Sequence, residues 1–147
     1  MTTARTLLLA LLICSVPAAG GTEGLGRLSR NPYAPDSTSN PVGPYGSSVS
    51  PSSINNPVGR YGSPVSPYSA TNPLSSSAPK LYDGGGNYRG RLSTNTLDPD
   101  STSNPVGRYG SPVSPDSINN PVGAGSRFRT DSPNNPYGRG WRIEGAK

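Results

Sequence analysis

The sequence predicts a mostly irregular or disordered chain, rich in turns and polyproline II, with no large globular core. Without the first 18 residues, Pro, Gly and Ser make up 58 of 129 residues, far above the roughly 25–30% typical of low-complexity chains. Leu, Ile, Val and Phe number only 17 of 129. Ordering a residue costs roughly 1–2 kcal/mol, and burying a large apolar side chain returns roughly 1.5–3 kcal/mol. So few apolar residues cannot offset the ordering of the whole chain.

Residues 1–20 have the pattern of a secretory signal peptide. Arg5 gives a positive start, residues 7–16 are apolar, and residues 17–21 are small and helix-breaking. The apolar stretch is shorter than the roughly 20 residues that span a bilayer. We therefore expect export to the periplasm or the extracellular medium, and no membrane span after cleavage.

Cleavage after Ala18 and cleavage after Gly20 both fit the sequence. A lipoprotein anchored through Cys14 is the less favoured alternative, because lipoproteins carry a small residue before that cysteine and here it is the bulky Ile13.

The exported chain lacks the residues that most enzymes and metal sites use. It has no His, and Cys14 is the only cysteine of the whole sequence. A disulfide frame, a thiolate site and a histidine base are therefore excluded. No serine has an activating base nearby, since Lys80 and Lys147 are the only lysines. We expect a protein without cofactor that is not an enzyme.

The clearest feature of the chain is a duplication. Residues 26–59 align with residues 90–123 at an offset of 64, with 27 of 34 positions identical, and residues 63–74 resemble residues 126–137 at an offset of 63. Within each half an Asn-Pro pair recurs about every sixteen residues. The asparagines of these pairs are Asn40, Asn56, Asn72, Asn104, Asn120 and Asn135. The sequence thus predicts two turn-repeat arrays, over 21–78 (expected to be disordered) and 94–138.

Each repeat contains two turns. Asn-Pro-Val-Gly fits a type I turn and Ser-Pro-Asp-Ser fits another, while the frequent prolines exclude helices. Two arrangements remain open. The favoured one is a hydrated polyproline-like chain with transient turns. The other is a tight solenoid in which Tyr45, Tyr61 and Tyr109 stack, although its apolar seam would be thin.

Residues 79–93 predict a β-hairpin between the arrays. Two short alternating segments flank the run 83–87, Asp-Gly-Gly-Gly-Asn, which suits a turn with positive φ. An isolated hairpin is marginal in water, so we expect a third strand from the C-terminal segment 139–147. The predicted mini-core of the second half is Leu81, Tyr82, Tyr88, Leu92, Trp141 and Ile143. The segment 24–28 resembles the second hairpin strand without its first, so the first half is expected to lack a core.

Two motifs suggest ligands but are incomplete. Residues 98–104 resemble the start of a calcium loop, yet they lack its glycine and its bidentate glutamate, and the first half has Ala34 in place of Asp98. The glycine-rich run 83–87 is not followed by the helix and the Lys-Ser/Thr pair of a phosphate loop. Capping and hairpin turns are the favoured interpretations, and no metal site is predicted.

Arginines paired with aromatic residues are the candidate binding contacts. In an exported chain, a cell-envelope polysaccharide or protein is a more compatible partner for such pairs than nucleic acid. A further such pairing lies at 127–129. The candidate contact residues are Arg60, Tyr61, Tyr82, Tyr88, Arg108, Tyr109, Trp141 and Arg142.

The phrases PKLYD…GNYRGRLS (79–93), SPDSINNP (114–121) and DSPNNPYGRGWRI (131–143) resemble a group of small exported bacterial proteins with SPDSxNNP(Y/V)G-type repeats. The resemblance covers residues 79–143 and implies an exported, hairpin-containing chain. That group has no assigned activity, so the resemblance implies no catalytic residue. The group favours Tyr after Asn-Pro, where this chain mostly has Val.

These features predict a non-enzymatic exported repeat protein that acts as a spacer or a weak multivalent binder at the cell envelope, because repeated weak contacts gain avidity when several engage together. The alternative is a small folded ligand-binding module over 79–143, with residues 21–78 as a disordered tether.

Overall fold

The computed structural model describes residues 21–147, so the predicted signal peptide lies outside the described residues. This part of the chain has no helix and four strands, β1 (Thr22–Leu28), β2 (Lys80–Tyr82), β3 (Tyr88–Arg91) and β4 (Trp141–Ala146). Accordingly, no described helix is long and apolar enough to cross a membrane. Most described residues lie in turns outside the strands, as the composition predicts.

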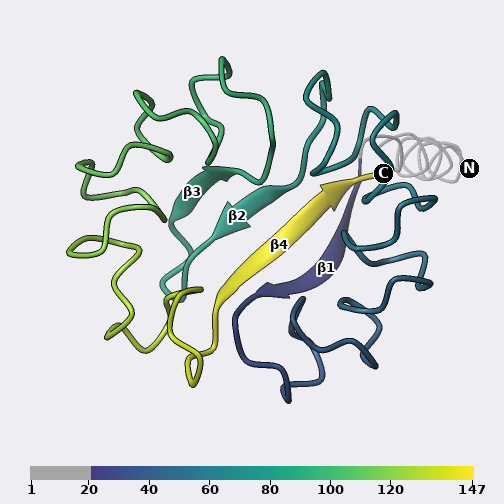
Figure 1. The fold of residues 1–147 in the computed structure, drawn as a ribbon, viewed down its shortest axis with the longest axis horizontal. Helices are drawn as coiled ribbons and strands as arrows, with labels where there is room; N and C mark the ends of the chain where they lie inside the picture. The colour runs from purple at the N-terminus through teal and green to yellow at the C-terminus, as the bar shows by residue number, and fades with distance from the viewer. Residues whose placement is uncertain (1–20) are drawn as a thin grey trace, which may run out of the picture.

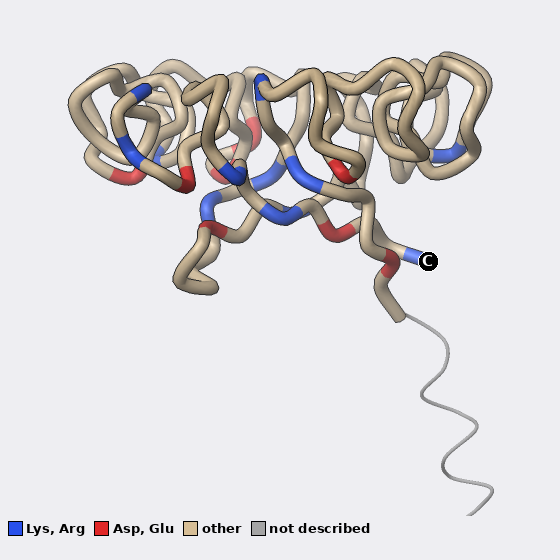
Figure 2. Tube along the Cα trace, turned by 90° about the horizontal axis from the view of Figure 1, so that it is seen from below, with Lys and Arg blue, Asp and Glu red and all other residues tan. Residues whose placement is uncertain are grey.

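The strands form one antiparallel sheet in the order β1-β4-β2-β3. The two long segments that join β1 to β2 and β3 to β4 surround the sheet as a ring of turns (Figure 1). In the perpendicular view the ring lies on one side of the sheet, and the β2–β3 turn projects on the other (Figure 2). The strand β4, the last in the sequence, lies between β1 and β2 and so joins the strands of the two halves into one sheet.

The two halves are related by an approximate two-fold axis at the centre of the sheet. There Leu81 of β2 pairs with Ile143 of β4. Positions 64 residues apart make equal backbone contacts: the N–H of Arg27 donates to the carbonyl of Asp36 at 2.7 Å, and that of Arg91 to Asp100 at 2.7 Å. Each half therefore consists of an outer strand, an array and an inner strand.

Successive β-turns build the arrays. Within 50–59, the N–H of Ser53 donates to the carbonyl of Ser50 at 3.2 Å, that of Asn56 to Ser53 at 3.4 Å, and that of Gly59 to Asn56 at 3.1 Å. The first side chain of a turn also accepts the N–H two residues on, as when Ser53 Oγ accepts that of Asn55 at 3.0 Å. Serine and asparagine satisfy the backbone of a turn in this way.

The asparagine of each Asn-Pro pair links two turns. Asn56 is buried, its Nδ2 donates to the carbonyl of Ser50 at 3.0 Å, and its Oδ1 accepts the N–H of Val58 at 3.1 Å. The same two bonds recur at Asn40, Asn72, Asn104, Asn120 and Asn135.

The residue before this asparagine joins neighbouring repeats. Asn55 Nδ2 donates to the carbonyls of Thr38 at 2.8 Å and Gly46 at 3.1 Å. These amide bonds hold the ring together where apolar side chains are scarce.

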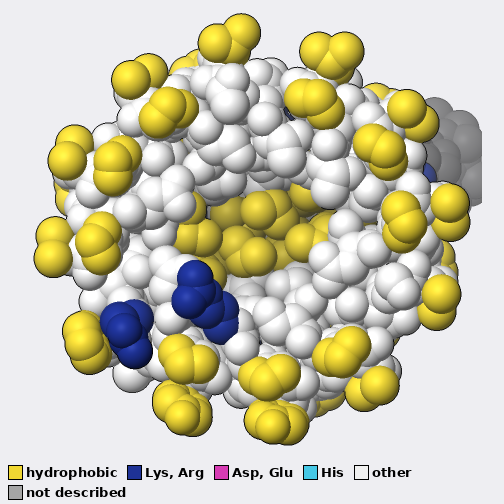
Figure 3. All heavy atoms as spheres, viewed as in Figure 1, with side chains coloured by type: hydrophobic (Ala, Val, Ile, Leu, Met, Phe, Trp, Pro, Cys, Tyr) yellow, Lys and Arg dark blue, Asp and Glu magenta, His cyan; other side chains and the backbone are white. Residues whose placement is uncertain are grey.

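A small apolar core lies between the sheet and the ring, and the ring face of the molecule is hollowed over it (Figure 3). The buried core residues are Leu25, Tyr61, Leu81, Ala124, Trp141 and Ile143, with Leu28, Ile54, Tyr68, Leu92 and Ile118 packed against them.

The predicted hairpin is present, and Gly86 in its turn has φ 83°. Of the predicted mini-core, Leu81, Trp141 and Ile143 are buried and Leu92 packs against them. The tyrosines of β2 and β3, by contrast, are half-buried.

The expectation that the first half lacks a core is wrong. Leu25 of β1 and Tyr61 of the first array are both buried in the core. The physical reason is that β1 finds its partner in β4, with Thr22 opposite Ala146 and Leu28 opposite Trp141. From the sequence we expected the C-terminal strand to pair with the hairpin only. In the structure it pairs with β2 of the hairpin on one side and with β1 on the other.

The structure also differs from the favoured hydrated, disordered chain and from the tether over residues 21–78. Both arrays are held in defined turns, and the first array forms half of the ring (Figure 1). The reason is that serine and asparagine, which the composition counts as solvent-seeking, are buried here and bonded to the backbone. The fully buried serines are Ser37, Ser53, Ser69, Ser101, Ser117 and Ser132.

Candidate binding surfaces

Three of the predicted contact residues are buried: Tyr61, Tyr109 and Trp141. The hydroxyl of Tyr61 donates to the carbonyl of Ala146 at 2.8 Å and lies 3.2 Å from Glu23 Oε1. Burial, together with the Glu23 carboxylate, raises the pKa of Tyr61. Tyr61 therefore fastens the first array to the ends of β1 and β4.

Trp141 and Tyr109 also pack against other residues of the protein. The guanidinium of Arg89 lies 5.9 Å from the Trp141 ring centroid. The Tyr109 ring packs edge-on against Tyr88, with centroids 5.4 Å apart. Because the aromatic surfaces of Trp141 and Tyr109 are covered by the protein, they offer little area to a partner.

Tyr82, Tyr88 and Arg142 are brought together at β2, β3 and β4. The two tyrosine rings are 5.8 Å apart, and the Arg142 guanidinium lies 4.8 Å from the Tyr82 centroid while pairing with Glu144 at 3.0 Å. The Tyr88 hydroxyl lies 3.0 Å from Asp100 Oδ2, and burial with this carboxylate raises the pKa of Tyr88. This group is half-exposed and internally satisfied.

Arg108 belongs to an ion network that fastens the second array to the hairpin. Arg108 pairs with Asp116 at 2.7 Å, Arg89 pairs with Asp116 at 2.7 Å, and Arg89 pairs with Asp83 at 2.8 Å. Burial alone would raise the pKa of Asp83, but hydrogen bonds from Asn87 and Arg89 outweigh it and lower the pKa below its ordinary value. Hydrogen bonding from Arg108 likewise lowers the pKa of Asp116.

Arg60 is engaged by aromatic rings rather than by carboxylates. Its guanidinium lies 4.1 Å from the Tyr68 ring centroid and 5.8 Å from that of Tyr61. Cation–π contact of this kind stabilises an arginine next to an otherwise apolar surface.

The apparent ligand motifs serve as turn caps. Asp98 Oδ1 accepts the N–H of Asp100 at 2.9 Å, and Asp83 Oδ1 accepts those of Gly85 and Asn87, both at 2.9 Å. Residues 21–147 contain no group of three or more side chains placed to hold a metal ion.

A first candidate surface is the rim, a set of twelve exposed large apolar side chains on the ring. They occupy two positions of each repeat: one lies two residues after the Asn of an Asn-Pro pair, and the other lies nine residues before that one. Apolar side chains surround the whole edge of the molecule (Figure 3). The rim is Tyr33, Val42, Val49, Val58, Val65, Leu74, Leu97, Val106, Val113, Val122, Phe128 and Tyr137, each 83–92% exposed.

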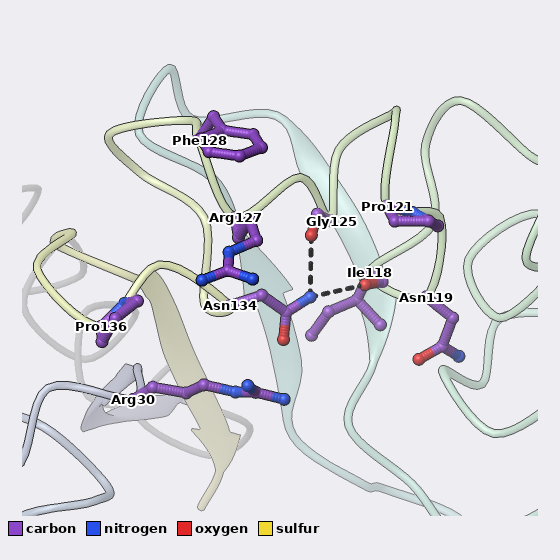
Figure 4. Close-up of a pocket in the computed structure, with 9 residues that line it drawn as sticks. All are labelled: Arg30, Ile118, Asn119, Pro121, Gly125, Arg127, Phe128, Asn134 and Pro136. Atoms are coloured by element: carbon purple, nitrogen blue, oxygen red, sulfur yellow. Dashed lines mark hydrogen bonds between the residues drawn. The ribbon is translucent and has the colours of Figure 1, made fainter.

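A second candidate surface is the seam cleft, where the end of the second array meets the start of the first (Figure 4). Its volume is about 670 Å³. Its lining residues are Arg30, Ile118, Asn119, Pro121, Gly125, Arg127, Phe128, Asn134 and Pro136.

Comparison with known proteins gives no relative: no family model, no curated protein and no solved structure matches this chain.

Proposed function

We propose that this is a non-enzymatic exported protein that binds a polysaccharide of the cell envelope through many weak contacts on its rim. The observation that carries the proposal is the repetition of exposed apolar side chains at two equivalent positions of every repeat. Exposed apolar side chains scattered singly are normal on protein surfaces, but these recur in pairs nine residues apart around the whole ring, as repeated contacts with a polymer require.

The chemistry of the first array, which forms half of the ring, suits a neutral, hydroxyl-rich polymer. Between residues 31 and 78 the only charged residues are Asp36 and Arg60. Valine, leucine and tyrosine can lie against the C–H faces of sugar rings, and the turn backbone lies close beside them. Because each contact is small, affinity depends on engaging several at once.

The test is a titration of the protein, residues 21–147, with polysaccharide purified from the cell envelope. Removing Val42 and Val58, both as Val→Ser, is compared with removing Val106 and Val122 in the other array. Each exposed valine contributes only partial burial, so we expect roughly a threefold loss of affinity per side chain. Multivalent binding predicts equal losses from the two arrays and a larger loss when all four are changed.

The control is Ser48→Ala, an exposed position next to the rim residue Val49. It should leave affinity unchanged, and none of the variants should shift the unfolding temperature because the valines are exposed. Unchanged affinity after all four substitutions, or no binding by the parent protein, contradicts the proposal and leaves the spacer role.

A further inference from the structure

We infer that the seam cleft is a single binding site for an acidic sugar, a uronate residue whose carboxylate pairs with Arg30 and Arg127. This site shares only Phe128 with the rim and does not depend on the valines of the rim. The cleft volume of about 670 Å³ lies within the range of small-molecule sites.

The cations of the cleft are free to bind. Arg30 comes from the start of the first array and Arg127 from the end of the second, and both extend toward the same opening (Figure 4). Both are exposed, and neither side chain forms an ion pair or a hydrogen bond with another described residue; the Arg127 guanidinium lies 5.8 Å from the Phe128 ring centroid, which leaves its N–H groups to a ligand. No acidic residue lines the cleft. A carboxylate is the group that two such guanidinium groups bind best, apart from phosphate.

The amides of the cleft supply fixed acceptors for sugar hydroxyls. Asn119 Nδ2 donates to the carbonyls of Thr102 at 2.9 Å and Gly110 at 3.0 Å. Asn134 Nδ2 donates to the carbonyl of Ile118 at 3.0 Å and to that of Gly125 at 2.9 Å. These bonds orient both amides, and their oxygens accept no bond from a described residue. In Figure 4 the Asn134 oxygen points away from the two bonds of its Nδ2, toward the side on which Arg30 lies.

The apolar walls complete the match with a sugar ring. Ile118, Pro121, Phe128 and Pro136 lie around the polar groups (Figure 4). A uronate presents a carboxylate, several hydroxyls and C–H faces. The arginines, the amide oxygens and these walls correspond to the three features. Phosphate offers no C–H face and no hydroxyl array, so a uronate uses more of the lining.

The other seam of the molecule provides an internal comparison. By the offsets of the duplication, Arg30 corresponds to Thr94, Arg127 to Pro64 and Asn134 to Thr71. The offset falls from 64 to 63 because the second array has Ala124 alone where the first has Arg60 and Tyr61.

At the other seam, the guanidinium of Arg60 lies against the Tyr68 ring. Within residues 21–147, two arginines without an ion pair, together with the amide oxygen of Asn134, therefore occur at the seam cleft only. General features of the repeat therefore do not explain the cleft.

The test is calorimetric titration of residues 21–147 with tetragalacturonate and with its methyl ester, which is neutral but otherwise alike. We expect one site per chain for the acid and at least tenfold weaker binding of the ester. Arg30→Gln and Arg127→Gln should each weaken acid binding about tenfold, as expected for loss of a charge-assisted hydrogen bond.

Arg139→Gln is the matched control, because Arg139 is an exposed arginine outside the cleft and its loss changes net charge equally. Equal binding of acid and ester, equal effects of Arg139→Gln and the cleft variants, or no binding of the acid would each overturn the inference. The four valine variants of the rim should leave this titration unchanged, so failure of the rim proposal and failure of the cleft proposal are distinguishable.

Discussion

The buried asparagine of the Asn-Pro pair allows a direct test of what stabilises the arrays. In Asn56→Ala the N–H of Val58 loses its partner at 3.1 Å, and the carbonyl of Ser50 loses one of its two donors, at 3.0 Å, while it keeps the N–H of Ser53. A net hydrogen bond is worth about 0.5–1.5 kcal/mol, and a buried group left unpaired costs about 1–3 kcal/mol. Two hydrogen bonds of this kind are lost, so we expect the free energy of unfolding to fall by about 1–3 kcal/mol.

The assay is urea unfolding followed by tryptophan fluorescence. Trp141 is the only tryptophan and is fully buried, so its emission reports the transition. Val58→Ser is the control, since that side chain is 89% exposed and surface changes stay within about 0.5 kcal/mol. If Asn56→Ala unfolds at the same urea concentration as the parent, or the parent has no cooperative transition, side-chain bonds do not hold the arrays.

Three further predictions concern packing, a hydrogen-bonded tyrosine and pH. In Gly110→Ala the new Cβ would collide with the Asn104 carbonyl, so we expect a loss of at least about 2 kcal/mol, whereas Gly24→Ala, with nothing within 4 Å, should be nearly neutral in thermal unfolding. Tyr61→Phe removes the hydroxyl bonded to Ala146 and should cost about 1–2 kcal/mol in urea unfolding; an unchanged midpoint would contradict this.

The pH prediction belongs with these. Asp83 and Asp131 have folded pKa values below their ordinary value, although burial opposes this, because hydrogen bonds from Asn87 and Arg89 and from Gly84 and Arg129 outweigh it. Their stabilisation is therefore present above the ordinary aspartate range and lost as pH falls through the folded pKa. With no histidine in the chain, the urea midpoint should be flat between about pH 5 and 8 and fall below about pH 4; a decline within the flat range would refute the assignment.

Much of the local structure follows from the sequence. Alternation and the glycine run 83–87 predict the hairpin, and Asn-Pro-Val-Gly predicts the turns that recur around Asn56 and Asn120. Both predictions use interactions between residues near in sequence, which propensity describes well.

The ordered ring could not be predicted, because counts of apolar residues omit hydrogen bonds between repeats. Asn55 reaches the carbonyl of Thr38, seventeen residues earlier, and no local pattern marks that contact. The pairing of β1 with β4 likewise joins the two ends of the described chain.

The candidate contacts were only partly predictable. Arginine next to an aromatic residue is a pattern that both buried and exposed pairs share, so it selected Tyr61 and Tyr109, which are buried. Arg127 belongs to such a pairing in the sequence, but Arg30 does not, and only the meeting of the two array ends brings them together. The change of offset from 64 to 63 is the one sequence signal that marks that seam.

The position of β4 in the sheet determines how early during synthesis the sheet can form. Its six residues follow all the other strands in the sequence yet lie between β1 and β2, so the sheet cannot be complete until the residues of β4 have been synthesised. For a protein that is exported as proposed, this delay would keep the chain threadable through a translocation pore until its last strand arrives on the far side.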